Sequence, residues 1–317
     1  MARPLRIEYP GAFYHVTSRG NERKDIFRSK RDREKFLDYL GSATVRYGAR
    51  IHVYCLMSNH YHLLVETPEG NLSRIMRHIN GAYTTYFNVK RQRSGHLLQG
   101  RYKAILVERE EHLVELSRYV HLNPVAARMV GKPGEHVWSS YNAYVGAAAS
   151  PDWLERRDVL ARFGEGEAAA GGSYRAFVEG DLDREVVVPS PWEKVVGSTV
   201  LGSRGFVEWV QETFIAAGSG DREVPAARAL AVWPSLDAIE AAVARGFPED
   251  SRLARKLALY LSHRHSGRPL KDIGNRFGLG PSGVSEASRS GAQAVAKWPE
   301  VRRRVAEIAR EVGITGF

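Results

Sequence analysis

Two histidines separated by a single residue are the first candidates for chemistry in this chain of 317 residues. His60 and His62 stand in the run SNHYHLLVE, and apolar and aromatic residues surround them. Such a run favours a β-strand, in which side chains two positions apart point to the same face. Two imidazoles side by side on a rigid strand can bind a metal ion. Two polar residues on the solvated face of a sheet would give the same pattern, so the pair alone leaves both interpretations open.

A second group of polar residues follows about sixty positions later, in the run SRYVHLNP. Tyr119 and Asn123 are four residues apart, so on a helix they share one face. Pro124 limits how far such a helix can continue. A phenol and an amide oxygen on one helical face can meet the two histidines. His121 is two positions from Tyr119 and points elsewhere, so we expect a structural role or contact with a partner rather than metal ligation.

The elements that must position these residues alternate between strands and helices. The patterns predict strands over residues 12–19, 51–57, 60–66 and 101–108, and helices over residues 29–47, 72–89 and 110–122. This order, βαββαβ, is that of a ferredoxin-like antiparallel sheet, so the predicted class is α+β. We expect the helices to cover one face and to leave the other free for a flat substrate. His15 and His52 fall on predicted strands and are interpreted as core or surface residues rather than ligands.

The charge of the chain is uneven. The net charge is +10, and residues 1–150 carry 23 Lys and Arg against 13 Asp and Glu, whereas the rest carries 23 of each. A basic excess in the half that holds the histidine pair suggests a polyanionic partner, for which nucleic acid is the usual identity. The single cysteine, Cys55, excludes an internal disulfide and fits a reducing compartment. No signal-peptide core and no run of eighteen apolar residues is present, so we expect a cytoplasmic, nucleoid-associated protein with no membrane partner.

The pattern after residue 146 differs from the first part. We predict three regions: residues 1–146, a helical linker region over 147–235 with a flexible loop at GEGEAAAGG (164–172), and a helical domain over 236–317. In the last region a short helix over 271–278, a glycine-containing turn and a second helix over 284–296 form a helix-turn-helix pattern. Arg276 is its candidate DNA contact. The alternative is a helical bundle that only packs.

Five motifs occur in a fixed order: GAFYHVTSRGNER, HYH, LLQGRYKAILVE, YVHLNPVAAR and WSSYNAY. Together they resemble the IS200-like single-tyrosine HUH transposases, and in particular their domesticated branch, the REP-associated tyrosine transposases, over about residues 1–146. The resemblance implies nicking and strand transfer on single-stranded DNA beside a hairpin. It also implies a 5′-phosphotyrosine intermediate and a free 3′-OH. The C-terminal helices resemble the DNA-binding domain of the replication initiator DnaA. However, PSGV (281–284) replaces the sequence-reading segment of that domain, which argues against recognition of the initiator's own DNA box.

These motifs lead to a residue-level hypothesis. Tyr119 is the nucleophile, and His60, His62 and the Asn123 side-chain oxygen bind one divalent cation. Mixed nitrogen and oxygen ligands with open positions suit Mg²⁺ or Mn²⁺. The candidate contacts to single-stranded or hairpin DNA are basic, amide or aromatic side chains that would hold phosphates or stack on bases: Arg19, Asn21, Arg101, Tyr102 and Lys103.

Two other functions fit the same sequence. The chain could be a domesticated protein that recognises hairpin DNA with weak or lost catalysis. It could instead be a regulator in which the C-terminal helices bind duplex DNA. Arg19 and Asn21 could be no more than a solvated turn, and Arg101 and Lys103 the solvated face of a strand. The sequence leaves open whether the chain acts as a monomer or a homodimer.

Overall fold

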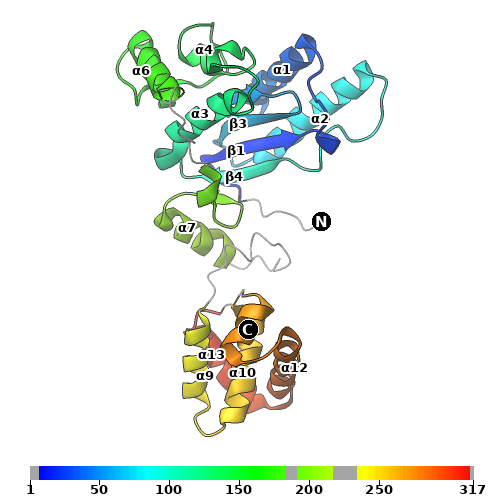
Figure 1. Cartoon of the computed structure of the whole chain (residues 1–317), viewed down its shortest axis with the longest axis vertical. Helices are drawn as coiled ribbons and strands as arrows, with labels where there is room; N and C mark the ends of the chain where they lie inside the picture. The colour runs from blue at the N-terminus through cyan, green and yellow to red at the C-terminus, as the bar shows by residue number, and fades with distance from the viewer. Residues whose placement is uncertain (1–6, 181, 183–190, 217–233, 267, 315–317) are drawn as a thin grey trace. The chain divides into compact units, whose positions relative to one another are not determined.

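The computed structural model describes residues 7–180, 182, 191–216, 234–266 and 268–314 (Figure 1). Two compact units divide the chain, one ending at Glu208 and the other beginning at Trp209. The first unit combines a sheet with helices, and the second contains only helices in its described part. The predicted class, an α+β domain followed by helices, is confirmed.

The sheet of the first unit has five strands in the order β2-β3-β1-β4-β5. Their bounds are Ala12–Arg19 (β1), Arg50–Leu56 (β2), His60–Thr67 (β3), Lys103–Val107 (β4) and Val200–Leu201 (β5). The first four strands pair antiparallel, in the ferredoxin-like arrangement that the βαββαβ order predicts. The short β5, which was not predicted, pairs parallel with β4.

Two long helices cover one face of this sheet, as Figure 1 shows. They are α1 (Lys30–Tyr47) and α2 (Leu72–Lys90). Aromatic side chains fill the space between the helices and the sheet. The Phe36 ring centroid lies 4.8 Å from that of Tyr61 and 5.1 Å from that of Tyr83. All three side chains are buried, so this face forms the main core of the unit.

The other face of the sheet is not free, and that part of the prediction is wrong. The helix α3 (Arg109–Ala126) lies across it, over β2 and β3 (Figure 1). Leu113, Leu116 and Val120 of α3 are buried, so the helix covers apolar surface that a solvated sheet would expose. α3 also continues two residues beyond Pro124, because a proline in the last turn removes a single helical hydrogen bond.

Short elements complete the first unit. They are η1 (Asn21–Arg23), η2 (Pro133–Glu135), α4 (Tyr141–Tyr144), α5 (Arg157–Leu160), α6 (Glu167–Glu179) and η3 (Pro191–Lys194). The helix α7 (Arg204–Val210) contains the boundary between the two units, and the π-helical turn η4 (Gln211–Ala216) follows α7.

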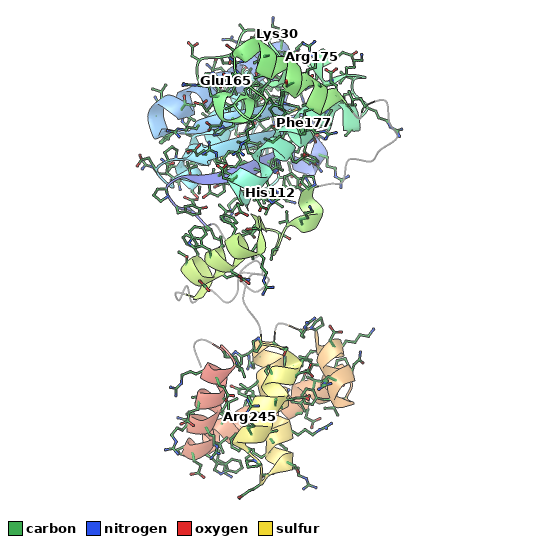
Figure 2. The ribbon with its side chains drawn as sticks, turned by 90° about the vertical axis from the view of Figure 1, so that its left-hand side faces the viewer. Lys30, His112, Glu165, Arg175, Phe177 and Arg245 are labelled. Atoms are coloured by element: carbon green, nitrogen blue, oxygen red, sulfur yellow. The ribbon has the colours of Figure 1, made fainter. Side chains whose placement is uncertain are left out.

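The loop predicted over 164–172 is wrong from residue 167 onwards, where α6 begins. A Cβ atom on Gly171 would come within 3.0 Å of the Tyr144 carbonyl oxygen, so this small residue lets the helix pack closely. The guanidinium of Arg118 on α3 lies over Phe177 of α6, 5.0 Å from the ring centroid (Phe177 is labelled in Figure 2).

The second unit contains the helices α9 (Leu236–Gly246), α10 (Ser251–His265), α11 (Leu270–Phe277), α12 (Pro281–Lys297) and α13 (Pro299–Glu311). Apolar residues from these helices form a separate core, with Ile239, Leu257, Ile273 and Val284 among them. Gly278 caps α11 at φ 67°, the left-handed region that glycine adopts readily. The helix, glycine turn and second helix therefore occur where the sequence predicts them.

His121 attaches α3 to its neighbours and creates a pH dependence of stability. The ring is buried; Nδ1 lies 2.7 Å from the Tyr174 hydroxyl and Nε2 2.7 Å from Ser140 Oγ. Burial lowers the pKa of His121 to about 3. Below pH 6.5 the unfolded chain takes up a proton at this residue and the folded chain does not, so stability is lost as the pH falls from 6.5 towards 3.

When the pH falls from 7.5 to 5.0, we expect the free energy of unfolding to decrease by about 2 kcal/mol because of His121 alone. Urea unfolding of the wild type and of His121→Gln at both pH values measures this contribution. The variant should be less stable at pH 7.5, and its further loss at pH 5.0 should be smaller by that amount. An equal loss in both proteins would show that His121 does not titrate in this way.

Candidate functional site

The histidine pair stands at the start of β3, in the interior of the sheet. His60 lies opposite Arg19 of β1, and His62 lies opposite Thr17. The two imidazole centroids are 5.0 Å apart. Because alternate residues of a strand share a face, both rings project towards the side that α3 covers. The structure therefore brings the two histidines together.

A third histidine, which the sequence assigned to the core or the surface, fixes the orientation of His62. His15 of β1 is buried, and its Nε2 lies 3.0 Å from His62 Nδ1. Burial lowers the pKa of His15 to about 3. Burial also holds the pKa of His62 well below its usual range, and the neighbouring His15 and His60 add to this effect. Both rings are therefore neutral, and one donates to the other. His62 Nε2 is buried and has no hydrogen-bond partner among the described residues.

Asn59 fixes the orientation of His60 in a similar way. Its side-chain Nδ2 donates to the Arg23 carbonyl at 2.9 Å, so its Oδ1 is turned towards His60 Nδ1 at 2.7 Å. An amide oxygen can only accept, which makes His60 Nδ1 the donor and leaves the lone pair on Nε2. Burial, assisted by Arg19, lowers the pKa of His60 to about 4. Near neutral pH this ring is also uncharged.

These two rings fit the requirements of a metal ligand pair. A metal-binding imidazole must be neutral, and its other nitrogen is usually held by a hydrogen bond. His60 and His62 meet both conditions, since Asn59 and His15 engage their Nδ1 atoms. The buried Nε2 of His62 is a polar atom that a cation would satisfy.

Tyr119 of α3 lies beside this pair. Its ring centroid is 6.3 Å from that of His62, with the ring planes at 74°. Asn123, one helical turn later, donates its side-chain Nδ2 to the Tyr119 carbonyl at 2.8 Å. No hydrogen bond to the Asn123 side-chain oxygen occurs within the described part of the chain, so that oxygen is available as a ligand. The helix thus carries a phenol and an amide oxygen on the face predicted from their spacing.

Trp192 of η3 completes the wall of the site. Its ring stacks on His15 with the centroids 4.3 Å apart and the planes at 26°. It also meets the Tyr119 ring edge-on, at 5.1 Å and 89°. The sequence around it, PW followed by LGSRGFVEWV, suggested no chemistry. A residue 73 positions after Tyr119 carries no local signal for such a contact.

Two predicted DNA contacts share the face of the histidine pair. Arg19 stands opposite His60, and Lys103 stands opposite Thr17, whose other neighbour is His62. Both are exposed, as are Asn21 and Arg101. Cations are thus present at the edge of the site that solvent reaches, where a phosphate backbone can bind.

Two other predicted contacts are occupied by the protein itself. Tyr102 is only 7% exposed, and its hydroxyl lies 3.4 Å from Ser73 Oγ, so its ring offers no open face to a base. Arg276 Nη2 forms ion pairs with Asp237 at 2.6 Å and with Glu240 at 3.0 Å. These pairs hold α11 against α9, and DNA would have to compete with them.

A second cluster of possible metal ligands lies elsewhere on the sheet. His52, Glu66 and Asp158 offer atoms within 4.8 Å of one another. However, Arg50 Nη1 lies 3.0 Å from Glu66 Oε1, and Arg109 forms an ion pair with Asp158. Two arginines already balance the two carboxylates, so a divalent cation would add excess charge. We interpret this cluster as an ion-pair network that holds α3 and α5 against the strands.

The region that supplies the histidines, Tyr119 and Asn123 also carries a family signal. Residues 9–123 match the IS200-like transposases (family model "Transposase IS200 like"). The match confirms the sequence resemblance over this IS200-like region, which runs from just before β1 to Asn123. Trp192 and the helical second unit lie outside it.

Solved structures that resemble this chain include a DNA complex. A solved structure described as a REP-associated tyrosine transposase bound to a REP hairpin is 17% identical, with a TM-score of 0.41. The match covers 49% of this chain and 92% of that one. No curated protein matches the chain. Within the described residues, no helix is both long and apolar enough to span a bilayer.

Proposed function

We propose that the chain nicks single-stranded DNA and transfers the strand, with Tyr119 as the nucleophile. The observation that carries this proposal is the position of the Tyr119 ring, 6.3 Å from a histidine whose Nε2 is unpartnered. The IS200-like region contains all four residues of the site, which supports the same reaction class.

The covalent step exchanges one phosphodiester for another. Tyr119 Oη bonds to the scissile phosphorus while the bond from phosphorus to the 3′ oxygen breaks. The phenol proton passes to solvent, and the departing oxygen takes up a proton to become a free 3′-OH. The product is a 5′-phosphotyrosine link of similar bond energy, so the step can reverse and rejoin strands.

The residues beside Tyr119 would hold a divalent cation, Mg²⁺ or Mn²⁺. His60 and His62 would bind it through Nε2, and Asn123 through its side-chain oxygen. When bound, such an ion acts as a Lewis acid towards a non-bridging phosphate oxygen. His15 and Asn59 keep the two rings in the required tautomer and orientation.

The proposed substrate is a single strand next to a hairpin, since an unpaired backbone can approach a site beneath α3 more easily than a duplex. Arg19 and Lys103 would hold its phosphates on either side of the histidine pair. A DNA substrate of this kind places the expected activity at the nucleoid, in the cytoplasm.

The test is a covalent trapping experiment. The full chain is incubated with a labelled DNA hairpin carrying single-stranded flanks and Mn²⁺, and the products are separated under denaturing conditions. We expect a labelled protein–DNA adduct and a free 3′-OH fragment, both abolished by EDTA. Binding of the hairpin without an adduct would show a DNA-binding protein that lacks this catalysis.

A further inference from the structure

A basic pocket lies in the connection between β1 and α1, and one of its lining residues, Ser58, comes two positions before His60. It has a volume of about 810 Å³ and is lined by four cationic residues, Arg23, Lys24, Arg28 and Arg33, against one carboxylate, Asp25. We propose that this pocket binds the phosphates of the DNA strand next to the cleavage site. The choice of DNA as the anion rests on the proposed function.

Most of these cations are not neutralised by the protein. Arg23, Arg28 and Arg33 form no ion pair within the described residues, whereas Lys24 pairs with Glu22. Arg33 lies over the rings of Phe27 and Trp138, at 5.6 and 5.5 Å from their centroids. Its Nε is buried without a hydrogen-bond partner in this part of the structure. Three charges around one open pocket are suited to successive phosphates of a nucleic acid strand.

The backbone of the pocket is held in an unusual conformation. Glu22 and Arg23 have φ values of 55° and 59°, the left-handed region that non-glycine residues rarely adopt. Strained backbone of this kind persists where surrounding structure enforces it, often at ligand sites. Here the enforcing contact is the bond from Asn59 Nδ2 to the Arg23 carbonyl.

The same contact connects the pocket to the metal-ligand pair. Asn59 joins the Arg23 carbonyl to His60 Nδ1, and Ser58, the preceding residue, lines the pocket. A strand whose phosphates occupy the pocket therefore lies one side chain away from His60. The pocket fixes the register of the strand relative to Tyr119.

The pocket is tested by binding, in the Tyr119→Phe background so that no adduct forms. The affinity of the full chain for a labelled single-stranded hairpin is measured over a salt series, with Arg23→Ala and with Arg23→Ala combined with Arg28→Ala. We expect each substitution to weaken binding several-fold and to lower the salt slope by about one. Arg46→Ala, an exposed arginine of α1, is the matched control and should change neither quantity.

If the double variant keeps the wild-type affinity for the hairpin and the wild-type salt slope, the proposal that this pocket binds DNA is overturned. If that variant does not fold, the single Arg23→Ala decides, because the Arg23 side chain makes no hydrogen bond or ion pair in the described structure. Inorganic phosphate is the second probe. Phosphate that binds the wild type but not the double variant, together with unchanged DNA affinity in that variant, would assign the pocket to a free anion instead of DNA. Because only binding is measured, the result is independent of whether Tyr119 reacts.

A different observation supports a second proposal: we infer that Trp192 positions Tyr119 for attack. The indole contacts the Tyr119 ring edge-on and stacks on His15, which in turn holds His62. The Trp192 side chain thus fixes the position of Tyr119 relative to the histidine pair. Trp192 lies outside the IS200-like region, so this chain supplies part of the site from beyond the family match.

Single-turnover nicking tests this role. Trp192→Ala should lower the rate at saturating DNA by about tenfold or more without weakening DNA binding, because a misplaced nucleophile loses rate rather than affinity. Trp192→Phe should restore most of the rate, since a phenyl ring can still meet Tyr119. An unchanged rate, or tighter DNA binding with a faster rate in Trp192→Ala, would contradict a positioning role.

A spectroscopic measurement tests the placement without any activity. Mn²⁺ bound at the histidine pair should quench the fluorescence of the nearby Trp192, whereas the Trp192→Phe protein should lose that quenched component. If both proteins show the same quenching, Trp192 does not lie beside the bound ion. The fluorescence measurement does not need the wild type to form an adduct. The proposed placement of Trp192 and the proposed reaction of Tyr119 can therefore fail separately.

Discussion

Tyr119→Phe is expected to form no covalent adduct with DNA and to retain wild-type affinity for the hairpin. The substitution removes only the hydroxyl and keeps the ring contacts with His62 and Trp192. Loss of a nucleophile in a covalent mechanism typically lowers the rate by at least about a thousand-fold. Denaturing gels of the labelled adduct measure the yield, and anisotropy measures the binding.

A matched control separates the nucleophile from a general effect of losing a phenol. Tyr47 of α1 packs against His78 on the opposite face of the sheet, at 5.4 Å between ring centroids. Tyr47→Phe should give the wild-type adduct yield. Full yield in Tyr119→Phe would mean that another group attacks the phosphorus, and the proposed role of α3 would fail.

The second large effect is expected from the histidine pair. His62→Ala removes one of the two proposed nitrogen ligands and leaves His15 without its partner. Loss of a supporting residue around a metal commonly weakens binding 10- to 100-fold, so removal of a ligand should weaken Mn²⁺ binding by more than about 100-fold. Titration calorimetry with Mn²⁺ measures this directly, and the trapping assay should show no adduct.

His52→Ala is the discriminating control for this experiment. His52 belongs to the other cluster of possible ligands, with Glu66 and Asp158. If the cation binds at the histidine pair, His52→Ala keeps its Mn²⁺ affinity. Affinity lost in His52→Ala but retained in His62→Ala would place the ion in the arginine-balanced cluster instead.

The sequence predicted much of this site because the relevant signals are local. Alternation over residues 60–66 predicts the strand that carries His60 and His62, and the four-residue spacing predicts the shared helical face of Tyr119 and Asn123. The basic excess of residues 1–150 and the order of motifs remain the basis for expecting a nucleic acid partner. The strand and the shared helical face each depend on neighbours within one element, so local spacing is enough to predict them.

What the sequence did not reveal depends on how distant elements pair. His15 reaches His62 because of the register between β1 and β3, which no local pattern specifies. Trp192 joins the site through tertiary packing alone. The burial of Tyr102 and the ion pairs of Arg276 also depend on neighbours remote in sequence. The run of small residues around Gly171 suggested a loop, yet the missing side chain of Gly171 lets a helix pack closely.

The short strand β5 has a practical consequence for dissecting this protein. The Leu106 and Glu108 amides donate to the carbonyls of Thr199 and Leu201, so the outer edge of β4 is sealed by chain from well beyond the family match. A truncated fragment ending at residue 123 or 146 would expose that edge, and an open β-edge recruits other chains into aggregates. Production of the sheet-containing portion alone should therefore retain the chain through Leu201.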